Sequence, residues 1–352
     1  EQRCPVLLHV RTVKGKGYSP AEERPADYHG VSPFDPVTGK PLRTAKMDFS
    51  HVFGQELTAL AGEDGRVCAI TAAMQEGTGL TEFARKYPDR LFDVGIAEGH
   101  AVSMAGGMAK QGLVPVFAVY SSFLQRGYDQ LLQDVALDGL HVVLGVDRAG
   151  LVGADGETHH GCFDALYLSQ VPHMTVLCPA SFAELRQMLR RAVLELTGPV
   201  AVRYPRGGEG AYQDCCGNET FTQVRPGADC TILTYGVLIN EALAAAELLH
   251  EAGVETRVVK LNAIAPLDGD AVLAALGSEK RLLVLEDCVG SGCVGQRLTA
   301  ILAQRGRMPE RLILKNLGDT IPCHGTVPQL YAQCGLDAAS VAAALKEACH
   351  EQ

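Results

Sequence analysis

The sequence predicts an α/β protein built from two parallel-sheet αβα domains, and three observations lead to this prediction. From Phe49 onward, short apolar runs typical of buried strands alternate with longer segments of helical period. Such spacing requires crossover connections and a parallel sheet. Residues 207–228 interrupt the rhythm with Gly, Asn, Asp and Pro before a second series begins. A length of 352 residues also suits about two domains.

The first series contains the elements of one domain. Apolar runs predict strands at 67–71, 91–94, 115–119, 141–146, 174–178 and 200–204. Helical periodicity predicts helices at 51–62, 80–86, 98–112, 123–136 and 181–196. We therefore assign residues 48–207 to the first domain.

The second series predicts a second domain at residues 229–352, after an interdomain linker at 208–228. Its strands are expected at 231–234, 257–261, 281–285 and 312–315, and its helices at 240–252, 268–276 and 338–348. Ahead of both domains, residues 5–10 predict a strand. A basic, glycine-spaced loop around Lys14 then suits either a solvated linker or a phosphate site made of backbone amides and lysine.

Composition restricts the class of partner. The chain is 47% hydrophobic and 20% charged, as in soluble globular proteins. Its net charge of -10 argues against nucleic acid or an anionic membrane as the main partner. Twelve scattered cysteines, with no signal peptide and no apolar run of about 18 residues, predict reduced thiols and a cytoplasmic location. A strand-like run so near the first residue leads us to expect a preceding segment.

Candidate chemistry gathers in the stretch DRAGLVGADGETHHGCFD, residues 147–164, which follows a predicted strand. Its glycines permit tight turns, and Arg148, Asp155, His159 and His160 supply titratable groups. Open α/β sheets bind ligands outside the carboxyl ends of their strands. A Ser-His-Asp hydrolase is disfavoured because no G-x-S-x-G elbow occurs. The adjacent histidines differ from the i, i+4 pair of many zinc enzymes, so we predict no metal site here.

Other candidates follow other predicted strands. Glu98 opens a helix, where it would either complement the helix dipole or act as a buried carboxylate tuned for proton exchange. Tyr120 and Phe123 would either pack in the core or offer a platform for a ring. Arg126 would either hold a phosphate by a forked contact or pair with Asp129.

Two arginines, Arg203 and Arg206, lie at the end of the last strand of the first domain and suit either an anionic substrate or a solvated turn. Each of these signals is weak alone. They share one position, however, at the carboxyl ends of strands in a single sheet. Together they predict one site for a ring-bearing cofactor and a phosphorylated or carboxylated substrate.

The chain resembles the 1-deoxy-D-xylulose-5-phosphate synthase family of the transketolase superfamily in four segments, FDVGIAEGHAV, YSSFLQRGYDQ, DRAGLVGADGETHHGCFD and AVRYPRG. The resemblance extends from HVRTVKGKGYSPAEERPADYHGV near the start to LEDCVGSGCVGQRL near residue 290. It implies a thiamine diphosphate pyrimidine-binding domain followed by a transketolase-type C-terminal domain. Residues 1–47 would be the tail of an N-terminal diphosphate-binding domain and a linker.

The resemblance also implies a reaction. The family joins pyruvate to D-glyceraldehyde 3-phosphate, giving 1-deoxy-D-xylulose 5-phosphate and CO2 for isoprenoid, thiamine and pyridoxal phosphate biosynthesis. Thiamine diphosphate and Mg2+ are the implied cofactors, and a homodimer is the implied assembly. Glu98 would bond to the aminopyrimidine ring, Phe123 would stack on it, and Lys14 would help to bind the cofactor.

The remaining implied roles concern substrate and protons. Asp155 and His159 would handle protons, and His29 would approach the cofactor as a further catalytic group. The implied substrate-binding residues are Tyr120, Arg126, Arg148, Arg206 and His159.

Three departures from the family pattern stand out. Gly99 and His160 both occupy positions where the family usually has Gln, which would retune the pocket. The GDG-type motif that binds Mg2+ and the diphosphate does not occur in these residues. We therefore expect a split subunit, a shortened chain or a partial gene product that needs an N-terminal diphosphate-binding domain or chain.

Two other functions stay open. A subunit similar to the 2-oxo-acid dehydrogenase β chain would suit the length but not the loop motifs, and acyl transfer to lipoamide would distinguish it. A non-catalytic remnant that dimerises or regulates would suit the missing motif. It would show no turnover even when the N-terminal half is supplied.

Overall fold

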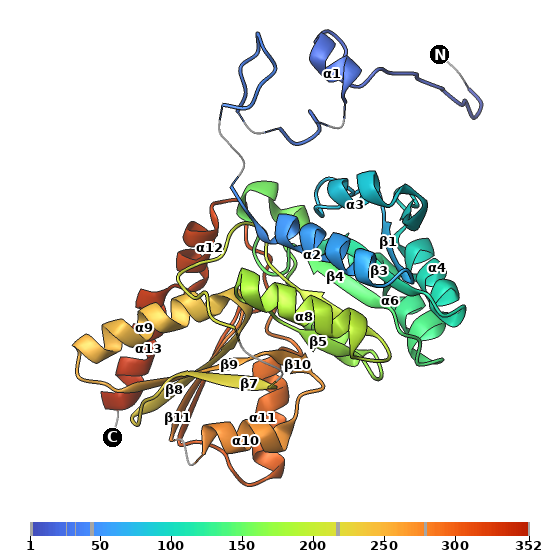
Figure 1. Ribbon diagram of the computed structural model, residues 1–352. Coiled ribbons are helices and arrows are strands. Elements are labelled where there is room, and N and C mark those ends of the chain that lie inside the picture. The colour runs from blue at the N-terminus through green and yellow to red at the C-terminus, as the bar shows by residue number, and fades with distance from the viewer. Residues whose placement is uncertain are drawn as a thin grey trace. The chain divides into compact units, whose positions relative to one another are not determined.

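The computed structural model describes residues 3–25, 27–31, 33–42, 46–215, 219–277 and 280–350. They fall in two compact units, Glu1–Lys46 and Met47–Gln352, which are described separately below. The second unit contains two sheets with their covering helices (Figure 1). No helix within the described ranges is both long and apolar enough to cross a membrane.

The first unit has one short helix, α1 (Ser19–Glu23), and a small aromatic cluster. The rings of Tyr18, Tyr28 and Phe34 lie with their centroids 5.3–5.9 Å apart. The strand predicted at residues 5–10 is wrong, since this run has no regular structure and the side chain of Leu7 is 95% exposed. A strand needs a neighbour for its backbone groups, and the described part of this unit offers no other strand.

The first sheet has seven strands in the order β10-β5-β6-β4-β3-β1-β2. Six belong to the first domain and pair in parallel. They are β1 (Val67–Thr71), β2 (Leu91–Asp93), β3 (Val114–Tyr120), β4 (Val143–Asp147), β5 (Thr175–Leu177) and β6 (Val200–Arg203). Every residue of β1, β4 and β6 is buried, which explains why these strands form continuous apolar runs in the sequence.

Helices cover both faces of this sheet. One apolar layer joins it to α2 (Phe49–Glu63), α3 (Thr81–Lys86) and α8 (Phe182–Leu194). The opposite layer joins it to α4 (Glu98–Lys110) and α7 (Asp164–Gln170). The side chain of Asp48 accepts a hydrogen bond from the His51 amide, and Ser181 does the same for Glu184. These N-caps fix where α2 and α8 begin.

The single helix predicted at 123–136 is wrong. This segment is divided into α5 (Ser121–Leu124), a 3-10 turn (Gln125–Gly127), α6 (Tyr128–Gln130) and a π-helix (Leu131–Ala136). Gly127 lies so close to α4 that a Cβ there would stand 2.9 Å from the side chain of Val102. This close approach, together with the π-helix, aims the side chains of the segment differently from those of a regular helix.

The second sheet has five strands in the order β12-β11-β8-β9-β7. They are β7 (Phe221–Arg225), β8 (Cys230–Tyr235), β9 (Thr256–Leu261), β11 (Arg281–Leu285) and β12 (Arg311–Lys315). Alternate strand residues face two helical layers. One holds α9 (Ile239–Glu251), α12 (Val327–Cys334) and α13 (Ala338–His350), and the other holds α10 (Gly269–Leu276) and α11 (Val294–Gln304). The predicted class of two αβα domains is confirmed.

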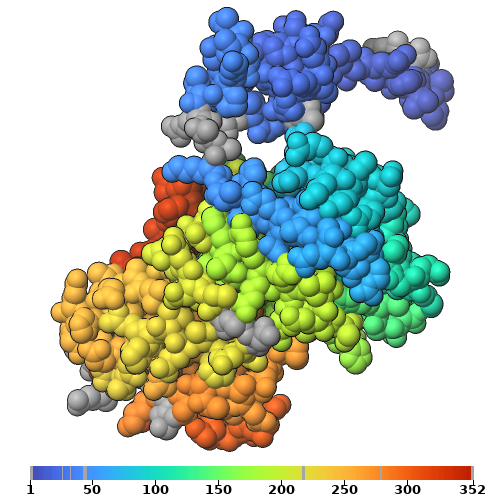
Figure 2. All heavy atoms as spheres, viewed as in Figure 1, coloured from blue at the N-terminus to red at the C-terminus, as the bar shows by residue number. Residues whose placement is uncertain are grey.

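The segment interpreted as a linker is not wholly irregular, because β7 lies within it and pairs antiparallel with β9. A further unpredicted strand, β10 (Ala263–Ala265), leaves the second domain and pairs antiparallel with β5 of the first sheet. One apolar cluster also extends from the α4 side of the first sheet to α10 and α11. On the face shown in Figure 2 the two domains lie against each other.

Candidate active site

The candidate residues lie at the carboxyl ends of four parallel strands of the first sheet, β2, β3, β4 and β6. β6, β4 and β3 are neighbours in the sheet, and β1 lies between β3 and the outer strand β2. Glu98 opens α4 just after β2, Tyr120 ends β3, Arg148 follows β4, and Arg206 follows β6. Because parallel strands present their carboxyl ends together, the fold brings these side chains to one place.

Glu98 forms one end of the site. Its side chain is only 3% exposed and lies in the first turn of α4, where the helix dipole favours a negative charge. Nη1 of Arg126 donates to Oε1 of Glu98 at 2.7 Å, and the Arg126 side chain is 57% exposed. Arg126 therefore pairs with Glu98. The alternative prediction, in which Arg126 pairs with Asp129, is wrong.

Three rings extend from this pair. The Phe123 and Tyr120 rings stack at 5.6 Å, and the His159 ring meets Phe123 edge-on at 5.1 Å. Cζ of Arg126 lies 5.1 Å from the centroid of Phe123, which joins the ring cluster to the ion pair. Phe123 and His159 are half-buried, so their rings remain partly accessible. Burial raises the pKa of the Tyr120 hydroxyl.

Asp155 connects two arginines at the other end of the site. Its Oδ2 accepts from Nε of Arg148 at 3.1 Å and lies 3.0 Å from Nε of Arg206. The guanidinium carbon of Arg148 lies 3.7 Å from the centroid of Tyr120, and its Nη1 donates to the carbonyl of Gly77 at 2.9 Å. The backbone of Arg148 has a φ of 61°, an uncommon conformation for a residue with a side chain. Residues in such conformations cluster at functional sites.

The two histidines of the loop differ. His159 faces the ring cluster, whereas His160 is buried and its Nδ1 accepts from the Val152 amide at 3.2 Å. Burial lowers the pKa of His160, which favours the neutral ring. Among the described residues, no group of three His, Cys, Asp or Glu side chains is arranged to hold a metal ion.

Lys14 and His29 lie in the unit Glu1–Lys46. Nζ of Lys14 lies 2.8 Å from Nδ1 of His29, and both residues are exposed. The structure thus brings these two candidates together within their own unit. Their predicted contact with the cofactor stays a prediction.

Sequence reasoning assigned no role to Asp147, which is fully buried at the end of β4. Ser50 donates to its Oδ2 at 2.7 Å, and Arg148 donates to its Oδ1 at 3.1 Å. Burial raises the pKa of Asp147 to about 6, although Arg148 acts in the opposite direction. The sequence did contain a signal for Asp147, namely a carboxylate at the end of an otherwise apolar strand. Such a group is buried with the strand and must find partners inside the fold.

The pair Arg203–Asp164 was also missed. Arg203 ends β6 and is 4% exposed, and it donates to both carboxylate oxygens of Asp164, at 2.8 and 3.1 Å. A bidentate contact of this kind fixes orientation as well as charge. Arg203 therefore holds the end of the loop, and only Arg206 of the two predicted arginines reaches Asp155.

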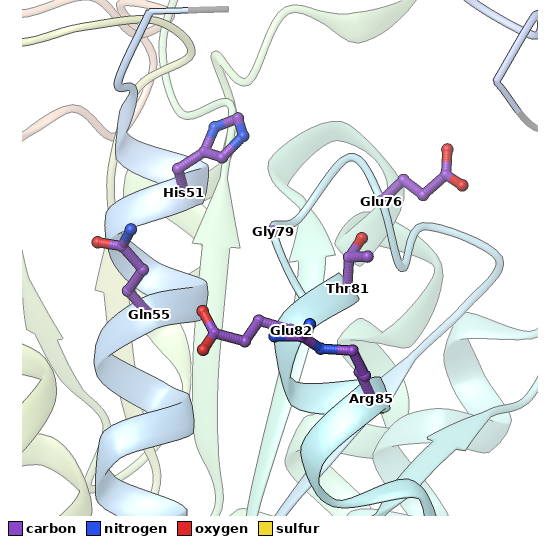
Figure 3. A pocket seen from close by; sticks show the side chains of 7 residues that line it. All are labelled: His51, Gln55, Glu76, Gly79, Thr81, Glu82 and Arg85. Atoms are coloured by element: carbon purple, nitrogen blue, oxygen red, sulfur yellow. The ribbon is translucent and has the colours of Figure 1, made fainter.

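Two hollows lie elsewhere in the second unit. The first, about 370 Å³, lies between α2 and α3 (Figure 3) and is lined by His51, Gln55, Glu76, Gly79, Thr81, Glu82 and Arg85. The second, about 560 Å³, is lined by residues between Asn316 and Cys334. None of the described residues that line them belongs to the candidate site.

Comparison with protein families matches two models. The transketolase pyrimidine-binding domain matches residues 45–208, and the transketolase C-terminal domain matches residues 220–341.

Curated relatives are similar over nearly the whole chain. The 1-deoxy-D-xylulose-5-phosphate synthase of Desulforudis audaxviator is 45% identical over 94% of this chain and 53% of its own length. That of Syntrophotalea carbinolica is 44% identical over 98% of this chain and 55% of its own length. The chain therefore spans about half the length of the curated relatives it matches.

Solved structures with the same fold include a split-gene transketolase described as an inactive β4 tetramer. It has a TM-score of 0.75 and 24% identity, covering 86% of this chain and 99% of that one. A Pichia stipitis transketolase in complex with sedoheptulose 7-phosphate has a TM-score of 0.72 and 14% identity, covering 87% of this chain and 46% of that one. At these identities the likeness concerns the fold alone.

Proposed function

The chain belongs to the transketolase family, in the branch of the 1-deoxy-D-xylulose-5-phosphate synthases, and we propose that it contributes one half of such an active site. The reaction is the condensation of pyruvate with D-glyceraldehyde 3-phosphate to 1-deoxy-D-xylulose 5-phosphate and CO2, which leads to isoprenoid precursors. One observation carries this proposal. The Glu98–Arg126 pair, the three rings and the Arg148–Asp155–Arg206 group form one continuous set of contacts.

The residues fit thiamine diphosphate, the cofactor of the family. Glu98 supplies a buried acceptor for the aminopyrimidine, and Phe123 supplies a half-buried ring to stack on it. Oε1 of Gln130 is buried without a partner among the described residues, 3.2 Å from where a Cβ on Gly99 would stand. An unpartnered buried acceptor near Gly99, the residue after Glu98, suits a ligand with N–H donors. When bound, the cofactor supplies the electron sink for the loss of CO2.

Arg148 and Arg206 suit the phosphate of the triose. Asp155 occupies one nitrogen of each guanidinium, which leaves further donors of Arg206 available because its side chain is 40% exposed. Arginine prefers such bidentate recognition of phosphate. His159, in contact with Phe123, would hold or move a proton at the reacting carbons, and Asp155 would orient the two arginines.

We place the groups that hold Mg2+ and the diphosphate outside these 352 residues. Support comes from the coverage, since the chain matches about half of each synthase. Lys14 and His29, which lie 2.8 Å apart, are proposed to meet the cofactor from the unit Glu1–Lys46. A homodimer is proposed by similarity to the superfamily, and sedimentation would test it.

The experiment is to supply the missing half. The diphosphate-binding region of the Desulforudis audaxviator synthase would be joined or mixed with this chain, together with thiamine diphosphate and Mg2+. We expect consumption of pyruvate that depends on glyceraldehyde 3-phosphate, with release of CO2. Cofactor binding without any triose-dependent turnover would contradict the proposal.

A second candidate is a non-catalytic assembly subunit. The observation in its favour is that the chain matches 99% of a split-gene transketolase chain whose β4 tetramer is described as inactive. It predicts self-association and no turnover, even with the diphosphate-binding region present. The same reconstitution therefore decides between the two functions.

A further inference from the structure

The second domain holds the loop that carries Arg148, Asp155 and His159. We call residues 147–164 the central loop and residues 286–290 of the second domain the clamp segment. The amide of Val289 donates to the carbonyl of Cys162 at 3.1 Å. Two residues earlier, the carboxylate of Asp287 lies against Gly150, near the start of the loop. The clamp segment therefore contacts the central loop near both of its ends.

The clamp segment is itself firmly anchored. Glu286, which is 1% exposed, accepts hydrogen bonds from the amides of Val294 and Gly295 at 2.9 and 2.8 Å. These amides begin α11, so the carboxylate caps that helix. The carbonyl of Cys288 also accepts from the Leu317 amide at 2.9 Å. Asp287 thus projects from a backbone with fixed neighbours on both sides.

Two glycines close the neck of the central loop. The amides and carbonyls of Gly150 and Gly161 form two reciprocal hydrogen bonds, each 2.8 Å long. Gly150 has a φ of 78°, and a Cβ there would lie 1.9 Å from Oδ2 of Asp287. The position therefore requires glycine for its conformation and for its distance from Asp287.

Asp287 also reaches the end of the loop through Arg203. Nη2 of Arg203 lies 3.6 Å from Oδ1 of Asp287, and the same guanidinium binds Asp164 with two hydrogen bonds. The Arg203 side chain is 4% exposed, and those of Asp164 and Asp287 are 0% and 5% exposed. Burial raises the pKa of Asp287, whereas Arg203 favours its charged form.

We propose that Asp287 is a positioning residue, which fixes the central loop by contacting Gly150 directly and Asp164 through Arg203. Its effect on a reaction rests on the proposed function, whereas its effect on the loop does not. Asp287 touches neither substrate nor cofactor in this scheme. Asp287 fixes the base of the central loop at Gly150, and from this base Arg148 and Asp155 extend to the site.

A purely structural role is the alternative, and another buried ion pair provides the control. Glu184 of the first domain lies 3.1 Å from Lys260 of the second, and both side chains are 0% exposed. The carboxylate of Glu184 also accepts from Tyr212 and from the Ala180 amide. None of these partners belongs to the central loop. Glu184→Gln therefore weakens a buried interdomain contact without touching the loop.

The test is hydrogen exchange of the full chain, followed by mass spectrometry on peptides from residues 147–164. We expect Asp287→Asn to speed exchange there at least tenfold, while peptides from β1 and β3 keep their rates. Asp287→Glu keeps the charge, but Gly150 leaves no room for another methylene, so it should also loosen the loop. It stays informative if Asp287→Asn does not fold. Glu184→Gln should leave the loop peptides unchanged.

Two results would overturn the proposal. One is unchanged exchange at residues 147–164 in both Asp287 variants, and the other is equal loosening by Glu184→Gln. In the reconstituted enzyme, Asp287→Asn should raise the KM for glyceraldehyde 3-phosphate at least tenfold and change kcat less. If the wild-type protein shows no turnover, the proposed function fails, and the exchange experiment still decides the role of Asp287.

Discussion

Nη1 of Arg126 lies 2.7 Å from Oε1 of Glu98, so that an exposed guanidinium covers a buried carboxylate. The pair joins α4 to the turn after α5, two segments that follow different strands. It leaves one oxygen of Glu98 for another partner within the site. That arrangement makes Glu98 the sharpest test of the proposed chemistry.

Glu98→Gln should lower kcat/KM of the reconstituted enzyme by about 10²–10⁴-fold, the loss typical of a group that moves a proton. Gln keeps the size of the side chain and one acceptor for Arg126. Steady-state kinetics with pyruvate and glyceraldehyde 3-phosphate would measure the loss. Glu82→Gln is the matched control, because Glu82 occupies the first turn of another helix, α3, outside the site. Equal rates for the two variants would exclude a proton-transfer role for Glu98.

Arg206→Gln should raise the KM for glyceraldehyde 3-phosphate about 10–100-fold and leave the KM for pyruvate nearly unchanged. A lost charge-assisted hydrogen bond costs about 1.5–3 kcal/mol. Arg206 is partly exposed and bonded to Asp155, so its removal should change binding more than folding. Arg186→Gln, on the α8 surface, is the control. Similar changes in both KM values would argue against a phosphate contact.

The buried carboxyl of Asp147 should make stability depend on pH. Its pKa is about 6 in the folded protein, above the ordinary Asp value, so the folded state holds this proton more tightly than the unfolded chain. The contribution of this proton to the free energy of unfolding is complete below about pH 4 and is lost as the pH rises through 6. Urea denaturation would measure the free energy of unfolding of both proteins. Between about pH 4 and pH 7, that of Asp147→Asn should rise relative to the wild type by about 2 kcal/mol. Parallel pH curves for the two proteins would refute this assignment.

Lys260→Met should lower the free energy of unfolding by about 3–5 kcal/mol, because it leaves the buried carboxylate of Glu184 without its cation. Methionine has a similar length, which limits the effect of lost volume. Lys110→Met is the control, since the Lys110–Asp138 pair is of similar chemistry but exposed to solvent. Urea midpoints should move for Lys260→Met and stay in place for Lys110→Met. Equal midpoints would mean that the buried pair adds no net stability.

Gly150→Ala should destabilise the protein by more than about 2 kcal/mol. Alanine is strained at a φ of 78°, and its Cβ would collide with the carboxylate of Asp287. Gly107→Ala is the contrasting change, because Gly107 lies inside α4 and a Cβ there meets nothing within 4 Å. That substitution should stabilise the protein by about 0.5–1 kcal/mol. Thermal denaturation would compare them, and equal effects would contradict the collision.

The sequence predicts most of this architecture because its strands are buried on both faces. Val67–Thr71 and Val143–Asp147 form continuous apolar runs that only a covered parallel sheet accommodates. The site follows from the same pattern, since Glu98, Tyr120, Arg148 and Arg206 all lie at or shortly after the ends of strands. Topology alone then brings them to one edge.

Other features depend on distant segments and leave no local pattern. The Glu98–Arg126 pair requires the close approach of Gly127 to α4, which divides a helix that looks regular in the sequence. The contact of Asp287 with Gly150 joins residues from different domains. The strand predicted at residues 5–10 is the opposite case, in which a local pattern exists but a distant partner among the described residues does not. High β propensity alone does not provide a neighbouring strand.

The short strand Ala263–Ala265 has a consequence for how such genes can be rearranged. It belongs to the second domain in sequence, yet it completes the first sheet by pairing with Val176 and Leu177. A recombination event that exchanged everything after residue 219 would leave β5 as an open edge, unless the incoming segment carried a matching strand. Open edges invite aggregation. The edge of the first sheet therefore depends on both domains, although two family models match them separately.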